Sequence, residues 1–390
     1  MKETLAFDFE RTFDRCTTLL GDLTFPSVAA WKQEHPGGRV IGYFPVYAPS
    51  EIIHAGGMLP VALHGAGDGL ELQHADARFG SFICSIVKST LELAMTDRLA
   101  LMDGLLFSTI CDSARNLAFV IKRNQPGKYV DFLHLPHNPN GTASHDFLAS
   151  EYRRLIGHLQ ELSGKTISDE ALRNSIAVFN ENRNLLRRLY DFRREYPERL
   201  RTWELYVLMR AGNFIPVEMH NEWLRGVLEE LPGRTGKRRD AIRVVIEGSF
   251  CEQPPLDLIR VMEEAGCTIA DDDFILGRRW FNSDVPVEGD PLMNLAESYQ
   301  DRSVYSSVRH DNRNPRHKQL VEKVKHAKAQ AVVFLTAKFC EPACFDYVLF
   351  KRELEAAKIP HLPLEFEEKA YTFDRFRMEV ETFVESLLFE

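Results

Sequence analysis

The sequence has no hydrophobic run long enough to cross a membrane and no excess of positive charge. Its longest apolar runs, such as residues 331–337, are far shorter than the ~20 residues that a transmembrane helix needs. The 57 acidic residues outnumber the 48 basic ones, so a net charge of -9 disfavours binding to phosphate backbones and anionic lipids. The N-terminal residues contain no apolar signal core. We therefore expect a cytoplasmic protein that binds neither nucleic acid nor membranes.

Motifs that bind nucleotides or catalyse common hydrolyses are also missing. The glycine-rich stretch Gly65–Leu70 lacks the last glycine of the dinucleotide-binding fingerprint, and residues 233–237 have the wrong spacing for a P-loop. The sequence contains neither a Gly-x-Ser-x-Gly elbow nor a His-Glu-x-x-His helix. We therefore expect no ATP or NAD site on this chain, and the sequence does not favour a serine hydrolase or a zinc protease.

Strands and helices are predicted to alternate after the first forty residues, which are themselves predicted to be helical. The chain has 390 residues, 44% of them hydrophobic, which is enough for about two to three domains. The predicted elements are a strand at 40–44, a helix at 50–56, a strand at 59–63, a helix at 81–97, a strand at 104–108, a helix from 112 and a strand at 129–135. This alternation indicates a parallel sheet covered by helices on both faces.

Residues 143–240 differ from the segments on either side. They are rich in Glu, Arg, Leu and Asn and poor in β-branched residues, which predicts several consecutive helices. The charged run Arg183–Arg201 contains both signs of charge. We therefore expect a solvated helix surface there rather than a basic binding face.

A second alternating section begins at residue 241, with strands predicted at 243–248, 267–270, 331–336 and 361–366. Helices are expected at 256–265, 315–328, 344–357 and from 373, and the stretch after the second strand is expected to be polar and irregular. The predicted fold class is α/β, with two Rossmann-like (flavodoxin-like) parallel-sheet lobes joined by a helical segment. The expected domains are an N-terminal α/β lobe with leading helices at 1–142, a helical segment at 143–240 and a C-terminal α/β lobe at 241–390.

The cysteines are the residues that point most directly to chemistry. There are seven of them, and a large cytosolic chain keeps its thiols reduced. Cys84, Cys111 and Cys340 stand at predicted helix N-termini, where backbone N–H groups favour the thiolate. Ligands of open α/β sheets collect beyond the carboxyl ends of the strands, so these sulfurs are candidates to converge between the lobes. Their spacing leaves open whether they bind a shared metal, as in zinc or iron–sulfur sites, or are packed thiols.

The other cysteines and one acidic run are less informative. Cys344 lies one helical turn beyond Cys340 and is either a fourth ligand or a packed neighbour, of which we favour the second. Cys251 follows a predicted strand and is a further candidate for the same cleft, whereas Cys16 and Cys267 are expected in the core. The run Asp271–Asp273 is typical of a hard-cation site or of a solvated strand end, and we favour the strand end.

Several segments of the sequence carry a family resemblance. They are Gly42–Val61, which contains Tyr-Phe-Pro-Val-Tyr-Ala-Pro-Ser-Glu-Ile-Ile-His, then Phe82–Cys84, Ser108–Asp112, Gly248–Pro255 and Lys338–Pro342. In this order they resemble the benzoyl-CoA reductase / 2-hydroxyacyl-CoA dehydratase family over essentially the whole chain. The segment Gly248–Pro255 is most similar to the C (gamma) subunit type of class I ATP-dependent benzoyl-CoA reductases.

The resemblance implies a cofactor and partners. In this family the cysteines that match Cys84, Cys111 and Cys340 ligate one [4Fe–4S] cluster per subunit. The catalytic subunits work as a pair of homologous chains and receive electrons from ATP-hydrolysing iron–sulfur activator subunits, so ATP is expected on a partner and not on this chain. Three protein thiolates leave one iron open for chemistry, whereas a fourth thiolate from Cys344 would make the cluster an electron relay.

The implied activity is the low-potential one-electron reduction of the aromatic ring of benzoyl-CoA to a cyclic dienoyl-CoA. One alternative is a subunit of a 2-hydroxyacyl-CoA dehydratase, which eliminates water through a ketyl radical. An alternative of another class is a cluster-free, two-lobed binding or scaffold protein. Glu51 and His54 lie three residues apart on a predicted helix and are candidate proton donors. A capping role for Glu51 and a hydrogen-bonded core position for His54 are slightly favoured over catalysis.

Overall fold

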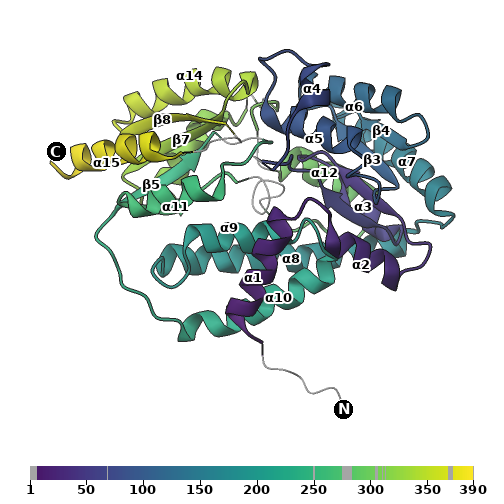
Figure 1. Cartoon of the computed structure of the whole chain (residues 1–390), viewed down its shortest axis with the longest axis horizontal. Helices are drawn as coiled ribbons and strands as arrows, with labels where there is room; N and C mark the ends of the chain where they lie inside the picture. The colour runs from purple at the N-terminus through teal and green to yellow at the C-terminus, as the bar shows by residue number, and fades with distance from the viewer. Residues whose placement is uncertain are drawn as a thin grey trace.

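Two parallel sheets organise the chain in the computed structural model, and each has four strands. The structure describes residues 7–67, 69–248, 251–274, 283–303, 306–309, 311, 313–367 and 372–389. Residue 68 of the glycine-rich stretch and residues 249–250 of the segment Gly248–Pro255 therefore lie outside the described residues. In Figure 1 the N-terminal lobe lies on the right and the C-terminal lobe on the left, with a layer of helices below both.

The strand order is the same in both lobes. In the N-terminal lobe it is β2-β1-β3-β4, and in the C-terminal lobe it is β6-β5-β7-β8. In both sheets the second strand along the chain lies at one edge, next to the first strand, and the fourth lies at the other edge. The strands are β1 Val40–Tyr43, β2 Leu59–Ala62, β3 Gly104–Ser108, β4 Tyr129–Leu133, β5 Ile242–Glu247, β6 Cys267–Asp271, β7 Ala331–Ala337 and β8 His361–Phe366. The predicted α/β class with two flavodoxin-like lobes is confirmed.

Continuous apolar sequences make the central strands. All five residues of β3 are buried, as are six of the seven in β7, because helices cover both faces of each sheet. The helices around the first sheet are α2 Pro26–Glu34, α3 Ser50–Ala55, α4 Gln73–Asp76, α5 Ser85–Met95, α6 Asp112–Asn124 and α7 Ser144–Ser163. Those around the second are α11 Leu256–Glu264, α13 Arg316–His326, α14 Glu341–Ala356 and α15 Asp374–Leu388.

A helical layer packs against both lobes. It comprises α1 Phe9–Gly21, α8 Asp169–Glu195, α9 Thr202–Ala211 and α10 Val217–Glu230, followed by the short 3₁₀ helix η1 Leu231–Gly233. Helix α8 has 27 residues and is therefore about 40 Å long. Its Leu172 and Ile176 belong to the core of the N-terminal lobe, whereas its Leu189 belongs to the core shared by α1, α9 and the C-terminal sheet. The layer thus ties the lobes together.

One helix lies where an irregular stretch was expected. Helix α12, Pro291–Asp301, begins after Asp290, whose carboxylate accepts hydrogen bonds from the Leu292 and Met293 backbone N–H groups. Proline at the first helical position and an aspartate cap before it are the sequence signals that predict this start. Helix α12 packs against α7 and α8, so the second half of the chain contributes to the N-terminal lobe (Figure 1). The predicted division of the chain into domains, with boundaries at 142/143 and 240/241, stays a prediction.

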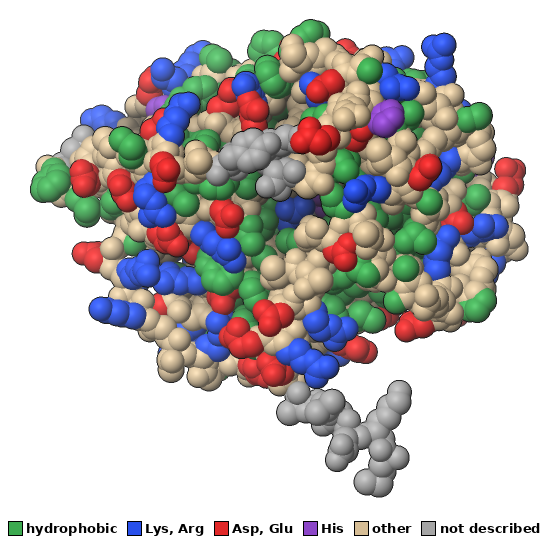
Figure 2. Space-filling model, in the orientation of Figure 1, with side chains coloured by type: hydrophobic (Ala, Val, Ile, Leu, Met, Phe, Trp, Pro, Cys, Tyr) green, Lys and Arg blue, Asp and Glu red, His purple; other side chains and the backbone are tan. Residues whose placement is uncertain are grey.

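The charged run 183–201 is only partly the solvated surface that the sequence predicted, since Arg188, Asp191 and Glu195 are exposed but two arginines are not. Arg183 and Arg193 are both buried, because Arg183 pairs with Glu51 and Arg193 pairs with Asp272 at 2.9 Å. On the face shown in Figure 2, positive and negative side chains are interspersed. None of the helices that the structure describes is long and apolar enough to span a membrane.

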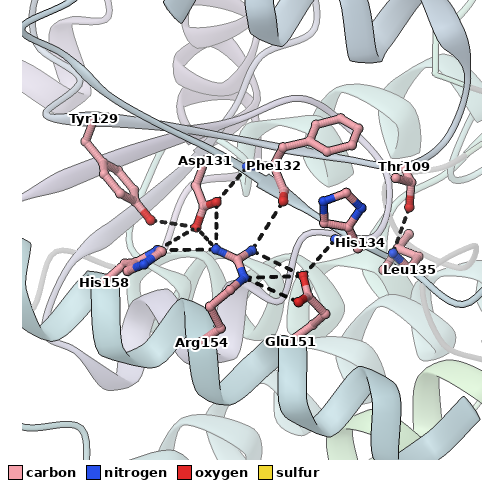
Figure 3. A network of polar contacts seen from close by, with 9 residues as sticks. All are labelled: Thr109, Tyr129, Asp131, Phe132, His134, Leu135, Glu151, Arg154 and His158. Carbon is pink, nitrogen blue, oxygen red and sulfur yellow. Dashed lines mark hydrogen bonds and ion pairs between the residues drawn. The ribbon is translucent and has the colours of Figure 1, made fainter. Parts of the chain in front are cut away.

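A network of polar side chains lies at the outer edge of the first sheet, where β4 is the last strand. Figure 3 shows Arg154 of α7 between Asp131 of β4 and Glu151, at 2.9 Å and 3.2 Å. Burial raises the pKa of Asp131, but hydrogen bonds from Tyr129, His158 and Arg154 outweigh it and hold that pKa below its usual value. Charged groups on an edge strand discourage pairing with another chain.

Candidate metal centre

Cys111 and Cys340 occupy equivalent places in the two lobes. Each directly precedes the helix that follows the third strand of its sheet, which is α6 after β3 and α14 after β7. Cys84 directly precedes α5 in the same way. All three cysteines therefore stand at helix N-termini, as the sequence predicted, where unpaired backbone N–H groups and the helix dipole favour negative charge.

Two loops at the carboxyl ends of the sheets have left-handed backbone at large side chains. Phe339, next to Cys340, has a left-handed backbone with a φ of 65°. In the loop after β1, Val46 and Tyr47 have φ values of 82° and 63°, and Val46 O accepts a hydrogen bond from Ser108 Oγ at 2.9 Å. Large side chains adopt this conformation only where surrounding contacts hold them there, and such strain is concentrated at functional sites.

The three cysteines line one cavity of about 630 Å³, and its walls come from both lobes. Cys84 and Cys111 belong to the N-terminal lobe, and Cys340 belongs to the C-terminal lobe. Aromatic side chains make much of the remaining wall, namely Phe44, Phe82, Phe339 and Phe345. Phe82 is 69% exposed and Phe345 is 75% exposed, so they form an apolar rim at the opening.

Burial and mutual repulsion oppose ionisation of these thiols. Burial raises the pKa of Cys84 well above its usual value, and the charges of Glu252, Cys111 and Cys340 raise it further. Burial also raises the pKa of Cys340 to about 12, partly opposed by the Ala343 backbone N–H. A positive charge beside these sulfurs would favour their ionisation.

The donor set fits a soft metal cofactor. Thiolates select zinc or iron–sulfur clusters, and the cavity supplies three of them from separate helix ends. Among the described residues, no three His, Cys, Asp or Glu side chains converge closely enough to hold a single metal ion. The structure thus brings three soft sulfur donors to one cavity.

The other four cysteines occupy different surroundings. Cys344 is exposed and does not line the cavity, although it lies on α14 one turn beyond Cys340. Cys251 is buried in the cavity wall, with its Sγ 3.9 Å from Pro45 O. Cys16 and Cys267 are buried in the core, as expected.

Glu51 and His54 do not line the cysteine cavity. Glu51 is buried, pairs with Arg183 and borders a second cavity of about 130 Å³ behind the loop that follows β1. His54 contacts Ser175 Oγ at 2.9 Å and Glu218 Oε1 at 2.8 Å, and the hydrogen bond from His54 lowers the pKa of Glu218. The catalytic roles of Glu51 and His54 stay predictions, and both side chains already have structural partners.

The acidic run Asp271–Asp273 is not the solvated strand end that the sequence favoured. All three side chains are buried at the carboxyl end of β6. Asp272 pairs with Arg193 at 2.9 Å, and Asp273 pairs with Arg316 at 3.2 Å. The arginines come from elements distant in sequence, which is why the local pattern did not reveal them.

Sequence reasoning also missed Glu252, which lines the cysteine cavity and is only 4% exposed. Its Oε1 accepts a hydrogen bond from Ser85 Oγ at 2.6 Å, and its Oε2 accepts one from the Ile86 backbone N–H at 3.1 Å. Its position directly after Cys251, beyond the end of β5, was the available signal.

Comparison with known protein families agrees with this arrangement. The family described as 2-hydroxyglutaryl-CoA dehydratase, D-component, matches residues 45–387. The chain belongs to this family. The matched range contains all three cysteines of the cavity, nearly all of the C-terminal lobe and the N-terminal lobe from the loop after β1 onward. The family predicted from the sequence motifs is confirmed.

Individual relatives align over nearly the whole chain. The C subunit of benzoyl-CoA reductase from Thauera aromatica is 39% identical over 374 residues, which cover 96% of this chain and 97% of the relative. The beta subunit of lactoyl-CoA dehydratase from Anaerotignum propionicum is 30% identical, with 90% and 92% covered. The beta subunit of (R)-2-hydroxyglutaryl-CoA dehydratase from Acidaminococcus fermentans is 27% identical, with 93% and 96% covered. The prediction that the chain is part of an enzyme is confirmed.

Proposed function

We propose that the chain is an iron–sulfur catalytic subunit of an ATP-dependent benzoyl-CoA reductase. The observation that carries this proposal is the single cavity lined by Cys84, Cys111 and Cys340 from both lobes. The 39% identity to the C subunit of a benzoyl-CoA reductase favours the ring-reducing branch of the family. The reaction would add two electrons, one at a time, and two protons to the aromatic ring of benzoyl-CoA, which gives a cyclic dienoyl-CoA.

In this proposal Cys84, Cys111 and Cys340 hold a [4Fe–4S] cluster, which supplies low-potential electrons when it is bound. The chain itself supplies three preorganised features. The helix ends direct backbone N–H groups toward the sulfurs, as the Val87, Ala114 and Ala343 amides do. Aromatic side chains line part of the cavity around the half-buried cysteines, and the cavity volume of about 630 Å³ is in the range of small-molecule sites.

The proposal requires partner chains. We expect a homologous catalytic subunit and an ATP-hydrolysing iron–sulfur activator, because the sequence contains no P-loop that would bind ATP. An electron donor must approach the cysteine cavity closely, and the exposed rim of Phe82 and Phe345 surrounds its opening. Exposed apolar patches of this kind commonly mark protein interfaces. We therefore assign the rim to the activator.

A dehydratase subunit is the second candidate. Relatives named as lactoyl-CoA and (R)-2-hydroxyglutaryl-CoA dehydratase beta subunits align over more than nine-tenths of their length. The two reactions use electrons differently. A ring reductase consumes electrons and ATP with every turnover, whereas a dehydratase recycles one electron over many turnovers.

The test is an anaerobic assay of the chain co-purified with its partner subunits. Benzoyl-CoA or a 2-hydroxyacyl-CoA is supplied with ATP and a strong reductant, and product and ATP hydrolysis are both measured. We expect a dienoyl-CoA product from benzoyl-CoA, with ATP hydrolysed in proportion to product. Turnover of the 2-hydroxyacyl-CoA with only catalytic ATP would assign the chain to the dehydratase branch instead. A complex without iron and without either activity would favour a cluster-free scaffold.

A further inference from the structure

Glu252 connects the C-terminal lobe to the helix that begins at Cys84. It lies in the loop that follows β5, whereas its partners Ser85 and Ile86 are the first residues of α5 in the other lobe. The two hydrogen bonds, at 2.6 Å and 3.1 Å, engage both carboxylate oxygens. Each bond joins two residues that are far apart in the sequence, with separations of 167 and 166 positions. The contact is therefore a link between lobes and not local helix capping from the same segment.

The carboxylate is suited to the N-terminus of α5 for two reasons. The first backbone N–H groups of a helix have no partner within the helix, and a carboxylate at this end interacts favourably with the helix dipole. Glu252 accepts the N–H of Ile86, while the next N–H, that of Val87, donates to the backbone carbonyl of Cys84 at 3.2 Å. Consecutive N–H groups of one helix end thus hold Glu252 and Cys84.

The same carboxylate places a negative charge beside the cysteines. Glu252 lines their cavity and is 4% exposed, so water screens its charge weakly. Its carboxylate lies close to sulfurs of both lobes, because Glu252, Cys84 and Cys340 line the same cavity. A fixed negative charge near a redox centre makes the addition of an electron less favourable and lowers the reduction potential.

We propose that Glu252 is a positioning residue that holds the Cys84 end of α5 against the C-terminal lobe and keeps the bound cluster at low potential. The second part of this proposal rests on the proposed function, since it concerns the cluster. The first part concerns the chain alone. Glu252 acts through Cys84 and through its charge, and it is not itself a ligand.

Two variants change the contact and the charge to different extents. Glu252→Ala removes both hydrogen bonds. Glu252→Gln keeps the size of the side chain and one carbonyl acceptor for the Ile86 N–H, but it removes the charge. Glu92→Gln is the matched control, because Glu92 is a buried carboxylate on α5 that accepts the Ala75 backbone N–H at 2.8 Å and does not line the cysteine cavity.

Hydrogen exchange of the iron-free chain tests the contact. We expect the Ile86 amide to exchange at least tenfold faster in Glu252→Ala than in the wild type, and to be unchanged in Glu92→Gln. An unchanged rate at Ile86 in Glu252→Ala would overturn the positioning role. If the alanine variant exchanges quickly throughout, the same measurement on Glu252→Gln decides, because a weakened acceptor must still raise the Ile86 rate.

Redox titration of the iron-loaded complex, followed by electron paramagnetic resonance, tests the charge. We expect Glu252→Gln to retain its iron and to change the reduced-to-oxidised ratio at a fixed potential about tenfold toward reduction, a positive shift of about 59 mV. If the midpoint potential of Glu252→Gln equals that of Glu92→Gln, the proposed effect of the charge is refuted. If the wild type holds no iron, the proposed function fails, while the exchange measurement still decides the contact.

Discussion

The two lobes have the same strand order, but the carboxyl ends of their sheets lie in different surroundings. In the C-terminal lobe, Arg316 is enclosed by the carboxylates of Glu247, Asp273 and Asp346. In the N-terminal lobe the counterpart of β5 is β1, which ends at Tyr43, and the hydroxyl of Tyr43 donates to Asn213 Oδ1 at 3.4 Å. Both lobes nevertheless present a cysteine after the third strand.

This difference shows that topology and electrostatics are separate properties of a lobe. The strand order places Cys111 and Cys340 at equivalent helix ends, whatever groups stabilise the neighbouring strands. The C-terminal lobe relies on buried ion pairs, which cost much to break because a partner is left charged and buried. The N-terminal lobe has the buried Glu51–Arg183 pair as well, but it also carries a partly exposed charged network at its sheet edge, which Figure 3 shows.

The largest effect is expected from Arg316→Ala. Removing this side chain leaves Glu247, Asp273 and Asp346 in a buried site without their shared cation. We expect a loss of about 3–5 kcal/mol in the free energy of unfolding. Arg154→Ala is the N-terminal counterpart, and because Arg154 is 31% exposed we expect a loss of only about 1 kcal/mol. Urea unfolding measures both, and equal losses would contradict the contrast between the lobes.

The helical layer that packs against both lobes contains a buried histidine. His220 of α10 accepts a hydrogen bond from Asn182 at Nδ1 and donates one to Leu208 O from Nε2. Burial lowers the pKa of His220 from 6.5 to about 4.

Acidification should therefore destabilise this layer. Below pH 6.5 the unfolded chain binds a proton at His220, but the folded chain does so only near pH 4, so this contribution is complete above pH 6.5 and is lost as the pH falls toward 4. We expect a loss of about 3 kcal/mol across this window. His220→Gln should lose less stability over the same range in urea titrations, and an equal pH dependence in both proteins would refute the assignment.

A smaller effect is expected where the second half of the chain reaches the N-terminal lobe. Asp290→Ala removes the cap of α12, at an expected cost of about 1 kcal/mol. Because α12 packs against α7, hydrogen exchange in α7 should become faster. Asp8→Ala removes a similar cap from α1, where Asp8 accepts the Arg11 N–H at 3.0 Å, and should leave α7 unchanged. The same acceleration in both variants would show that α12 does not support this lobe.

The sequence predicted the sheets well because their strands are continuous apolar runs bounded by turn residues. The strand at 104–108 and the placement of Cys111 and Cys340 before helices follow from that local pattern. Helix α12 was missed because a polar composition concealed the Asp290–Pro291 start signal. The buried pairs Arg193–Asp272 and Arg183–Glu51 were missed because each joins residues far apart in the chain. Glu252 was missed for the same reason, since its partners lie in the other lobe.

The most direct test of the account is the iron content of single cysteine variants of the anaerobically purified complex. Cys111→Ser and Cys340→Ser remove the equivalent thiols of the two lobes, whereas Cys344→Ser changes an exposed thiol on the same helix that does not line the cavity. We predict loss of bound iron and sulfide in the first two variants and wild-type content in the third. Full iron content in Cys340→Ser, or iron loss confined to Cys344→Ser, would contradict a cluster shared by the two lobes.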